Sequence, residues 1–243
     1  MEVIKSDLFS EIDFINHGFF NRHGGKSCGD FGSLNVGLNR GDNAQTVLIN
    51  REIIAKHFDC NISGLVMLNQ GHGNYVHLID EKTDLSITQT GDSIITNQPR
   101  ILIGVGTADC APILLCDKET RFIGAIHAGW RGVIAGVIEN TIKKLQSLGC
   151  SNITAAIGPC LQKQSFKVDP EIITQVHKTY LFESDDQIYF DLPLLINDKL
   201  SELGVNKVSM INIDTFSNND FFSYRRQSGH CGVQFSGLYL KNK

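Results

Sequence analysis

Three short apolar runs lie close together in the middle of the chain and dominate its hydrophobic pattern. They are ILIGVGT at 101–107, PILLCD at 112–117 and RFIGAIH at 121–127, with turn-length polar pieces between them. Runs of this length that are largely apolar are typical of strands covered on both faces. Further short apolar or alternating runs predict strands at 64–70, 75–79, 153–158, 207–213 and 231–240.

Other segments show the spacing of apolar residues that is expected of helices. They cover about 44–58, 132–148, 169–180 and 191–204. Asp42, Asp169 and Asp191 are the expected N-caps of the first, third and fourth segments, and Gly149 is expected to end the second. Strands mixed with helices predict an α/β (α+β) fold, with mixed β-sheets flanked by helices.

The composition limits the domain organisation and the partners. The chain of 243 residues is 42% hydrophobic, which is enough for a substantial core, and it contains no linker, low-complexity tract or internal repeat. We therefore expect residues 1–243 to form a single domain. The net charge of -4 and the pI near 6.0 argue against nucleic-acid and membrane partners, because such partners require clustered Lys and Arg.

Two features of the sequence indicate the compartment. The first residues lack a basic region leading into an apolar one, and no run approaches the roughly 20 apolar residues of a membrane span. The seven cysteines are odd in number and form no CxxC pair, which favours free thiols in a reducing compartment. We expect a cytoplasmic protein that is a monomer or a homodimer.

Reactive side chains cluster where the predicted central strands end. TADC places Asp109 and Cys110 after the first run, and HAGWRG places His127 and Arg131 at the end of the third. Loops that follow rigid strands present polar side chains to clefts. The turn at 70–74, between two other predicted strands, would push His72 into the same kind of cleft.

His72, Cys110 and His127 meet the requirement of a catalytic zinc site, which is three protein ligands and one open position. Zinc in such a site converts water into a usable nucleophile near neutral pH. The alternative is that Cys110 is a buried small residue and each histidine a structural one.

Asp109 allows three interpretations. It is a candidate general acid or base, a hydrogen-bond partner of His127 or His72, or a turn cap.

Three arginines lie beside aromatic residues. Arg131 follows Trp130, and Arg225 and Arg226 follow Tyr224 in FFSYRR. Their guanidinium groups are therefore candidates for bidentate contacts with an anion. The alternative is that the three arginines lie on a solvated surface.

The glycine-rich segment 22–42 carries no phosphate-binding fingerprint. It is either a wall or lid of the cleft, with Ser27 and Asn35 as substrate contacts, or a surface loop.

The order of several motifs resembles one known family. The motifs are RHGGKSCGDFGSLNVGLNRGD, the NR pair at 50–51, NQGHG, TADCAPILL, HAGWRG, IGPC and FFSYRR. They occur in the same order in the laccase-domain proteins, which were once described as multicopper polyphenol oxidases. These proteins are now treated as zinc-containing purine nucleoside phosphorylases with adenosine deaminase activity. The resemblance runs from about Arg22 to Arg226.

The resemblance implies a function, a fold and a ligand set. It implies phosphorolysis of adenosine, inosine and 5'-methylthioadenosine, deamination of adenosine, and a mixed α/β fold shared with certain cysteine-dependent toxin domains. The family's metal-binding residues fall on His72, Cys110 and His127. Two positions depart from its pattern: Asp214 stands where relatives often have Cys, and His230 where they usually have an Arg. If that Arg holds phosphate, His230 would make phosphate binding weaker and dependent on pH.

These residues suggest a division of roles. In deamination Asp109 would shuttle protons to the departing ammonia, and in phosphorolysis Arg131 and Arg225 would position phosphate.

Three alternatives to this function stay open. Two His and one Cys also describe a blue-copper site of a polyphenol oxidase, although eight His are few for several coppers. Cys110 activated by His127 would make a metal-free hydrolase or amidase, and a nucleoside-binding module without catalysis would use the same cleft.

Overall fold

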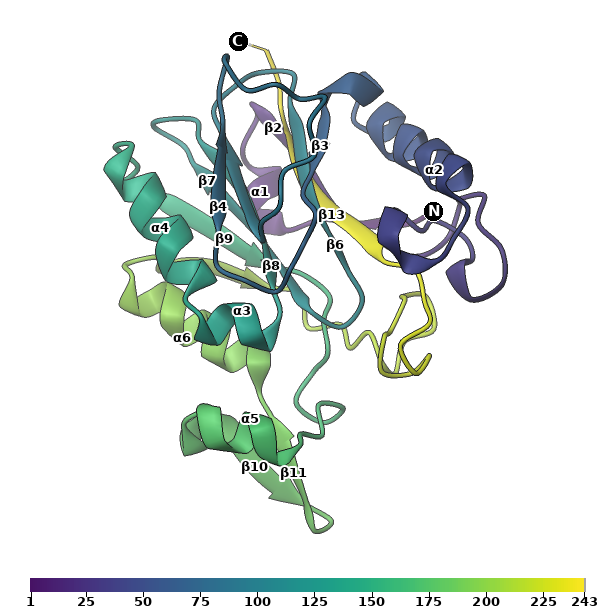
Figure 1. The fold of residues 1–243 in the computed structure, drawn as a ribbon. Coiled ribbons are helices and arrows are strands. Elements are labelled where there is room, and N and C mark those ends of the chain that lie inside the picture. Colours follow the sequence, from purple (N-terminus) through teal and green to yellow (C-terminus); the bar gives the residue numbers. More distant parts are fainter. Residues whose placement is uncertain (243) are drawn as a thin grey trace.

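Two β-sheets stack face to face, and helices cover the outer face of each sheet (Figure 1). This computed structural model describes residues 1–242. From one side to the other the layers are α2 (Ala44–His57), a five-stranded sheet, a six-stranded sheet, and a layer formed by α3 (Trp130–Ile134), α4 (Val137–Ser147) and α6 (Leu192–Glu202). No helix within residues 1–242 combines the length and the apolar character needed to cross a membrane.

The five-stranded sheet has the strand order β1-β2-β13-β6-β3. Its strands are β1 (Val3–Ile4), β2 (Ile15–Phe20), β13 (Gln234–Leu240), β6 (Leu102–Thr107) and β3 (Leu65–Met67). The last strand of the chain, β13, pairs antiparallel with both β2 and β6, so it lies in the middle of the sheet. The short helix α1 (Asp7–Ser10) connects β1 to β2.

The six-stranded sheet has the strand order β12-β9-β7-β8-β5-β4. Its strands are β12 (Lys207–Met210), β9 (Ile153–Ile157), β7 (Ala111–Asp117), β8 (Ile123–Ala128), β5 (Ser93–Thr96) and β4 (Val76–Ile79). The two outer pairs are parallel, and the inner pairs β9–β7, β7–β8 and β8–β5 are antiparallel. The sheet is therefore mixed.

Each interface between layers has its own hydrophobic core. Phe19, Ile94, Ile103, Leu114 and Leu238 are fully buried between the two sheets. A second core joins the six-stranded sheet to α3, α4 and α6, and a third joins α2 to the five-stranded sheet. Strands buried on both faces need apolar residues at every position, which explains why the central runs do not alternate.

One segment projects from the layered body. It consists of α5 (Pro170–Gln175), a 3-10 turn at Lys178–Tyr180, and a hairpin of β10 (Leu181–Ser184) and β11 (Gln187–Phe190) (Figure 1). Pro170 at the start of α5 follows Asp169, as predicted, but the helix ends at Gln175 rather than near Tyr180. The chain becomes extended at Val176, whose side chain is buried against the core.

The mixed α/β fold predicted from the sequence is confirmed, and so are the three central strands. The helix predicted over 132–148 is instead two helices, because Gly136 has a φ of 92° and breaks the chain between α3 and α4. The N-cap of α2 is Asn43, whose side chain accepts a hydrogen bond from the Thr46 amide at 3.0 Å, and not Asp42. The sequence pattern did not predict β2, β5 or the β10–β11 hairpin.

Candidate metal centre

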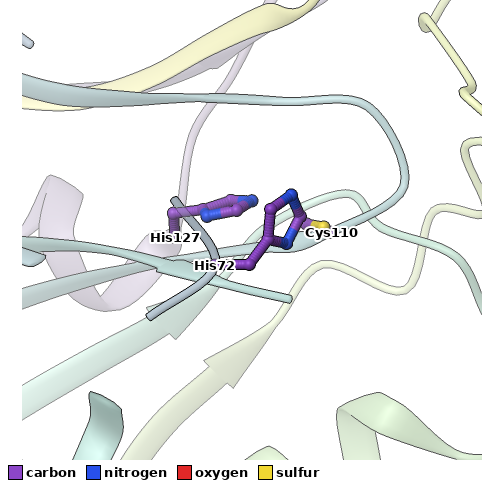
Figure 2. A group of neighbouring side chains, drawn as sticks. All are labelled: His72, Cys110 and His127. Carbon is purple, nitrogen blue, oxygen red and sulfur yellow. The ribbon is translucent and has the colours of Figure 1, made fainter. Parts of the chain in front are cut away.

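Three potential metal ligands from distant segments meet at one point. His72 lies in the loop between β3 and β4, Cys110 in the turn between β6 and β7, and His127 near the end of β8. One nitrogen of each imidazole and the Cys110 sulfur all lie within 4.8 Å of one another. Figure 2 shows the three side chains side by side. The two imidazole rings lie edge to face, with 4.7 Å between their centroids. Within residues 1–242 this is the only such group of three or more.

The strand register explains why Cys110 meets His127. β7 pairs antiparallel with β8 so that Pro112 lies opposite His127 and Ala111 opposite Ala128. Cys110, which directly precedes β7, therefore lies beside the end of β8 although the two residues are far apart in the sequence. Gly129 completes this corner, because a Cβ atom there would lie 2.8 Å from His72 Nδ1 and 3.0 Å from Cys110 Sγ.

Asp92 holds the two histidines in place. Its Oδ1 accepts hydrogen bonds from His127 Nδ1 at 2.7 Å and from the His72 amide at 2.9 Å. Its Oδ2 accepts from the amides of Gly73 at 2.7 Å and Gly71 at 3.2 Å. The bond to Nδ1 directs Nε2 of His127 away from Asp92, toward the group of ligands. The amide bonds stabilise the His72 loop, in which His72 has a φ of 58°.

The sequence interpretation missed Asp92. Its place is set by the antiparallel pairing of β5 with β8, in which Ser93 lies opposite Ile126, so the residue before β5 lies next to His127. Nothing in the polar stretch before β5 signals this pairing. The only hint in the sequence is a carboxylate directly ahead of a short β-branched run.

The charged forms of Cys110 and His127 stabilise each other. Burial raises the pKa of the Cys110 thiol, but His127 and His72 lower it by more, so the pKa falls below that of an ordinary cysteine. Burial lowers the pKa of His127, but the Cys110 thiolate and Asp92 raise it by more. A thiolate is the form in which cysteine binds metal. The thiolate of Cys110 is therefore favoured, and a metal bound here would take the place of the proton on His127, since a ligating imidazole is neutral.

The donor set fits a zinc ion. Zn–S bonds of about 2.3 Å and Zn–N bonds of about 2.0–2.1 Å put the ligand atoms of a tetrahedral site roughly 3.5 Å apart. Donor atoms within 4.8 Å of one another reach that geometry with small side-chain shifts. His127 is buried, whereas His72 is exposed. A fourth position would therefore face the cavity rather than the core.

A cavity of about 750 Å³ opens in front of the three side chains. His72, Cys110 and His127 form part of its wall. The aromatic residues of its lining are Trp130, Phe166 and Tyr224, and the arginines are Arg40, Arg51, Arg131 and Arg225. A cavity of this size that combines aromatic surface with a few cations suits a small anionic or heteroaromatic ligand.

Asp109 lines the same cavity with little exposure, next to Cys110. Its backbone has a φ of 83°, and its carboxylate accepts hydrogen bonds from the Thr215 hydroxyl and the Arg225 amide, each at 2.7 Å. It does not hold either histidine, since Asp92 does so. Instead Asp109 ties the segment at 215–225 to the wall of the cavity.

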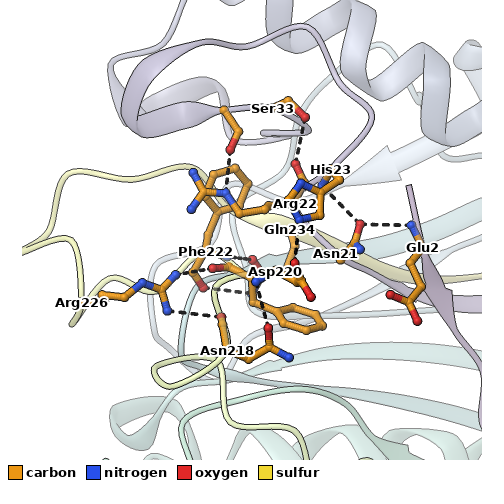
Figure 3. Close-up of polar contacts among 12 residues, drawn as sticks. Glu2, Asn21, Arg22, His23, Ser33, Asn218, Asp220, Phe222, Arg226 and Gln234 are labelled. Carbon is orange, nitrogen blue, oxygen red and sulfur yellow. Dashed lines mark hydrogen bonds and ion pairs between the residues drawn. The ribbon is translucent and has the colours of Figure 1, made fainter.

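Two of the predicted arginines reach the cavity and one does not. Arg131 stacks over Trp130 and donates from one terminal nitrogen to both carboxylate oxygens of Glu171, at 3.0 and 2.9 Å. Arg225 donates to the Lys167 carbonyl at 2.6 Å. Arg226 is absent from the cavity lining and donates to backbone carbonyls, among them that of Asn218 (Figure 3). Arg226 is therefore a structural residue of its loop.

Comparison with known proteins agrees with the geometry. The family described as multi-copper polyphenol oxidoreductase laccase matches residues 16–241. The chain belongs to this family. The family resemblance predicted from the motifs is thereby confirmed.

Named relatives and solved structures cover almost the whole chain. A purine nucleoside phosphorylase of Deinococcus radiodurans is 31% identical over 236 residues, which cover 94% of this chain and 90% of that protein. Purine nucleoside phosphorylase ORF3 of Streptomyces griseus is 33% identical over 216 residues, covering 86% and 87%. The crystal structure of the Bacillus licheniformis hypothetical protein YfiH superimposes with a TM-score of 0.90 at 25% identity, covering 95% and 94%. That of Neisseria meningitidis protein NMB0706 has a TM-score of 0.86 at 28% identity and covers 100% of both chains.

Two substrate contacts predicted for this laccase-family chain lie elsewhere. Ser27 and Asn35 are buried, and neither belongs to the cavity lining. Ser27 donates to Asp42 at 2.6 Å, and the Asn35 side-chain amide donates to the same carboxylate at 2.9 Å. Together with Asn50, which donates to Ser27 at 2.9 Å, they hold the glycine-rich loop against α2. Their roles in this structure are structural.

The two departures from the family pattern also lie outside the cavity lining. Asp214 is buried and accepts hydrogen bonds from the Ser165 hydroxyl at 2.5 Å and the Phe216 amide at 3.1 Å. His230 is mostly exposed, with its ring edge to face against Phe31 and a nitrogen 3.8 Å from Asp30. Neither side chain belongs to the group of three potential metal ligands.

Proposed function

We propose that the protein is a zinc-dependent purine nucleoside phosphorylase that acts on adenosine, inosine and 5'-methylthioadenosine and also deaminates adenosine. The observation that carries this proposal is the meeting of His72, Cys110 and His127 at the wall of a cavity of about 750 Å³. The naming of relatives as purine nucleoside phosphorylases supports the reaction class. The seven free thiols support a reducing compartment such as the cytoplasm.

His72, Cys110 and His127 would hold the metal. A bound zinc ion supplies Lewis acidity and lowers the pKa of water in its open position. A multicopper oxidase requires several copper sites, whereas residues 1–242 contain one group of ligands. We therefore favour zinc over copper as the resident ion.

In phosphorolysis a phosphate oxygen forms a bond to C1' of the ribose while the bond from C1' to the base nitrogen breaks. The electron pair of that bond stays with the base, and the proton of the phosphate ends on the base. The products are ribose 1-phosphate and the free purine. Asp109, which lines the cavity, would transfer this proton, and Arg131 and Arg225 would position the substrate.

Deamination uses a different carbon of the same substrate. Water replaces the amino group of adenosine, and ammonia leaves after it has gained a proton, which Asp109 would deliver. Because the two attacked carbons lie on different rings of the nucleoside, adenosine needs two orientations in the cavity. The size of the cavity, about 750 Å³, is large enough for such reorientation of a nucleoside.

The experiment follows products from the purified protein. Incubation with inosine is expected to release ribose 1-phosphate and hypoxanthine only when phosphate is present. Incubation with adenosine is expected to give inosine without phosphate. Formation of neither product, with zinc bound to the protein, would reject the proposal.

One arrangement favours a second candidate function. Asp92 orients His127, and His127 lies beside Cys110, which is the order of groups in a catalytic triad with a cysteine nucleophile. In that case the protein would be a metal-free hydrolase or amidase. Hydrolase activity that survives chelators and is lost on alkylation of Cys110 would select this function over the phosphorylase.

A further inference from the structure

The arginines that line the cavity differ in whether a carboxylate forms an ion pair with them. Among the residues that the structure describes, Arg131 forms an ion pair with Glu171, whereas Arg40, Arg51 and Arg225 have no carboxylate within 4.0 Å. Arg131 is also 54% exposed at its side chain. A guanidinium whose charge is already balanced in water gains less from an incoming anion than an unpaired, desolvated one.

Arg51 is the cation most strongly withdrawn from water. It lies on α2 and reaches the cavity, and burial lowers its pKa to about 10. Its Nε donates to the Val36 carbonyl at 2.9 Å, which fixes the plane of the guanidinium. Its two terminal nitrogens make no hydrogen bond to the residues that the structure describes. A guanidinium held in one plane, with unpaired N–H groups on its terminal nitrogens, can donate two parallel hydrogen bonds to the oxygens of a phosphate.

Arg40 lies on the same wall. Its Nε donates to the Cys231 carbonyl at 3.2 Å, and its guanidinium lies over the Tyr224 ring at 5.5 Å. Its aliphatic stem packs on Gly37, where a Cβ atom would lie 2.7 Å from Arg40 Cγ. Arg51 is bound to the preceding residue, Val36, so the two arginines meet the same short segment of backbone.

The three carboxylates that line the cavity form no ion pair with Arg40 or Arg51. Asp109 accepts from Thr215 and from the Arg225 amide, and Glu171 accepts from Arg131. Asp169, the third, directly precedes α5 on the projecting segment. Among the described residues no carboxylate lies within 4.0 Å of the Arg40 or Arg51 guanidinium, so neither charge is balanced by an ion pair.

We propose that Arg51, together with Arg40, binds the phosphate that attacks the nucleoside, in the place that the sequence pattern assigned to Arg131. This inference rests on the proposed phosphorylase function and names the subsite of its second substrate. The phosphate bound there supplies the oxygen that forms the bond to C1'. Its proton passes to the departing base, so that no further reactant is needed.

The test combines direct binding with kinetics on the zinc-loaded protein. Inorganic phosphate is titrated against the wild type and the Arg51→Gln and Arg51→Lys variants, with the dissociation constant read from thermal shifts. Loss of a charge-assisted bidentate contact is expected to weaken phosphate binding at least about tenfold in Arg51→Gln, with partial recovery in Arg51→Lys. The Michaelis constant for phosphate should rise in parallel, and that for inosine should change less.

Two arginines serve as comparisons. Arg100 is exposed and outside the cavity lining, so Arg100→Gln should bind phosphate like the wild type. Arg131→Gln should weaken phosphate binding less than Arg51→Gln does. Unchanged phosphate binding in a folded Arg51→Gln, or a larger loss in Arg131→Gln, would overturn the inference.

Adenosine 5'-monophosphate separates the two sources of a phosphate group. If this monophosphate binds through Arg51 and inorganic phosphate does not, the subsite serves a nucleotide and the inference is wrong. Binding of inorganic phosphate through Arg51 without release of ribose 1-phosphate would reject the phosphorylase function while leaving the anion site in place. The two failures are therefore distinguishable.

Discussion

At the scale of single residues, Asp92 is the buried carboxylate on which the geometry of the candidate metal centre depends. It is 1% exposed and binds His127 and three amides of the His72 loop. In Asp92→Asn the side-chain nitrogen cannot accept from an amide, and the negative charge is lost. We expect zinc affinity to fall about 10–100-fold, as measured by competition with a chromogenic chelator.

Asp117 offers a matched control for this substitution. It is also 1% exposed and accepts hydrogen bonds from four backbone amides, including those of Thr120 and Asn152, but it lies at the far end of β7. Asp117→Asn should lower stability and leave zinc affinity unchanged. Equal zinc affinity in Asp92→Asn and the wild type would show that Asp92 does not position the ligands.

Gly129 is the second residue whose identity the metal centre requires. A methyl group there would lie 2.8 Å from His72 Nδ1 and 3.0 Å from Cys110 Sγ, and so would push the ligands apart. Gly129→Ala is expected to lose most of its bound zinc, as measured by elemental analysis. Gly71→Ala is the control, since a Cβ at Gly71 meets no atom within 4 Å. Full zinc occupancy in Gly129→Ala would contradict this account of the site.

The residues that sequence reasoning found are those beside strong local signals. Cys110 and His127 border apolar runs, and His72 lies in a turn between two such runs, so each was recognisable without coordinates. Asp92 and Arg51 were not, because the pairing of β5 with β8 and the contact of Arg51 with Val36 are long-range. Ser27, predicted as a substrate contact, does not line the cavity, because its loop packs against α2.

At the scale of elements, a break separates α4 from α3, the helix that carries Trp130 and Arg131 at the cavity. Gly136 forms the break with a φ of 92°, and a Cβ there would make only an ordinary contact, 3.7 Å from Glu139. Gly136→Ala should therefore cost about 1 kcal/mol in the free energy of unfolding, through backbone conformation alone. Urea unfolding measures this cost.

Gly204 provides the comparison for that break. It has a φ of 84° with no atom within 4 Å of a Cβ, so Gly204→Ala should cost a similar amount. A gain in stability in Gly136→Ala would mean that one continuous helix fits over 132–148. The apolar spacing of that region predicted such a helix, because spacing reports which face is buried and does not detect a single left-handed residue.

The remaining elements differ in how far the sequence could predict them. β6, β7 and β8 are apolar along their length because both faces are covered, and this made them visible. β5 is a strand of four residues after a polar segment, and β10 and β11 are only partly buried, so their patterns resemble loops. The layer order depends on pairings such as that of β13 with β2, which no local pattern specifies.

At the scale of the whole molecule, His17 makes stability depend on pH. Its ring is buried on β2, and Nε2 accepts a hydrogen bond from the Ser6 amide at 2.8 Å, which requires the neutral form. Burial and the nearby Lys5 lower its pKa to about 4. In the unfolded chain the pKa is about 6.5, so the unfolded state binds the proton more readily between these values.

The free energy of unfolding should therefore fall as the pH is lowered from about 6.5 to about 4, with His17 contributing up to about 3 kcal/mol. Above that range its contribution is constant. Urea unfolding at pH 7.5 and 5.0 measures the difference, which should shrink in His17→Gln. His23→Gln is the control, because His23 is exposed. The same pH dependence in His17→Gln as in the wild type would exclude His17 as the cause.

The central claim is that His72, Cys110 and His127 together bind one zinc ion at the wall of the cavity. The most direct measurement is the metal content of the protein purified without added metal, compared with that of Cys110→Ser. We predict close to one zinc per chain in the first and little in the second. A wild type that carries no zinc, or a folded Cys110→Ser that retains it in full, would contradict the claim.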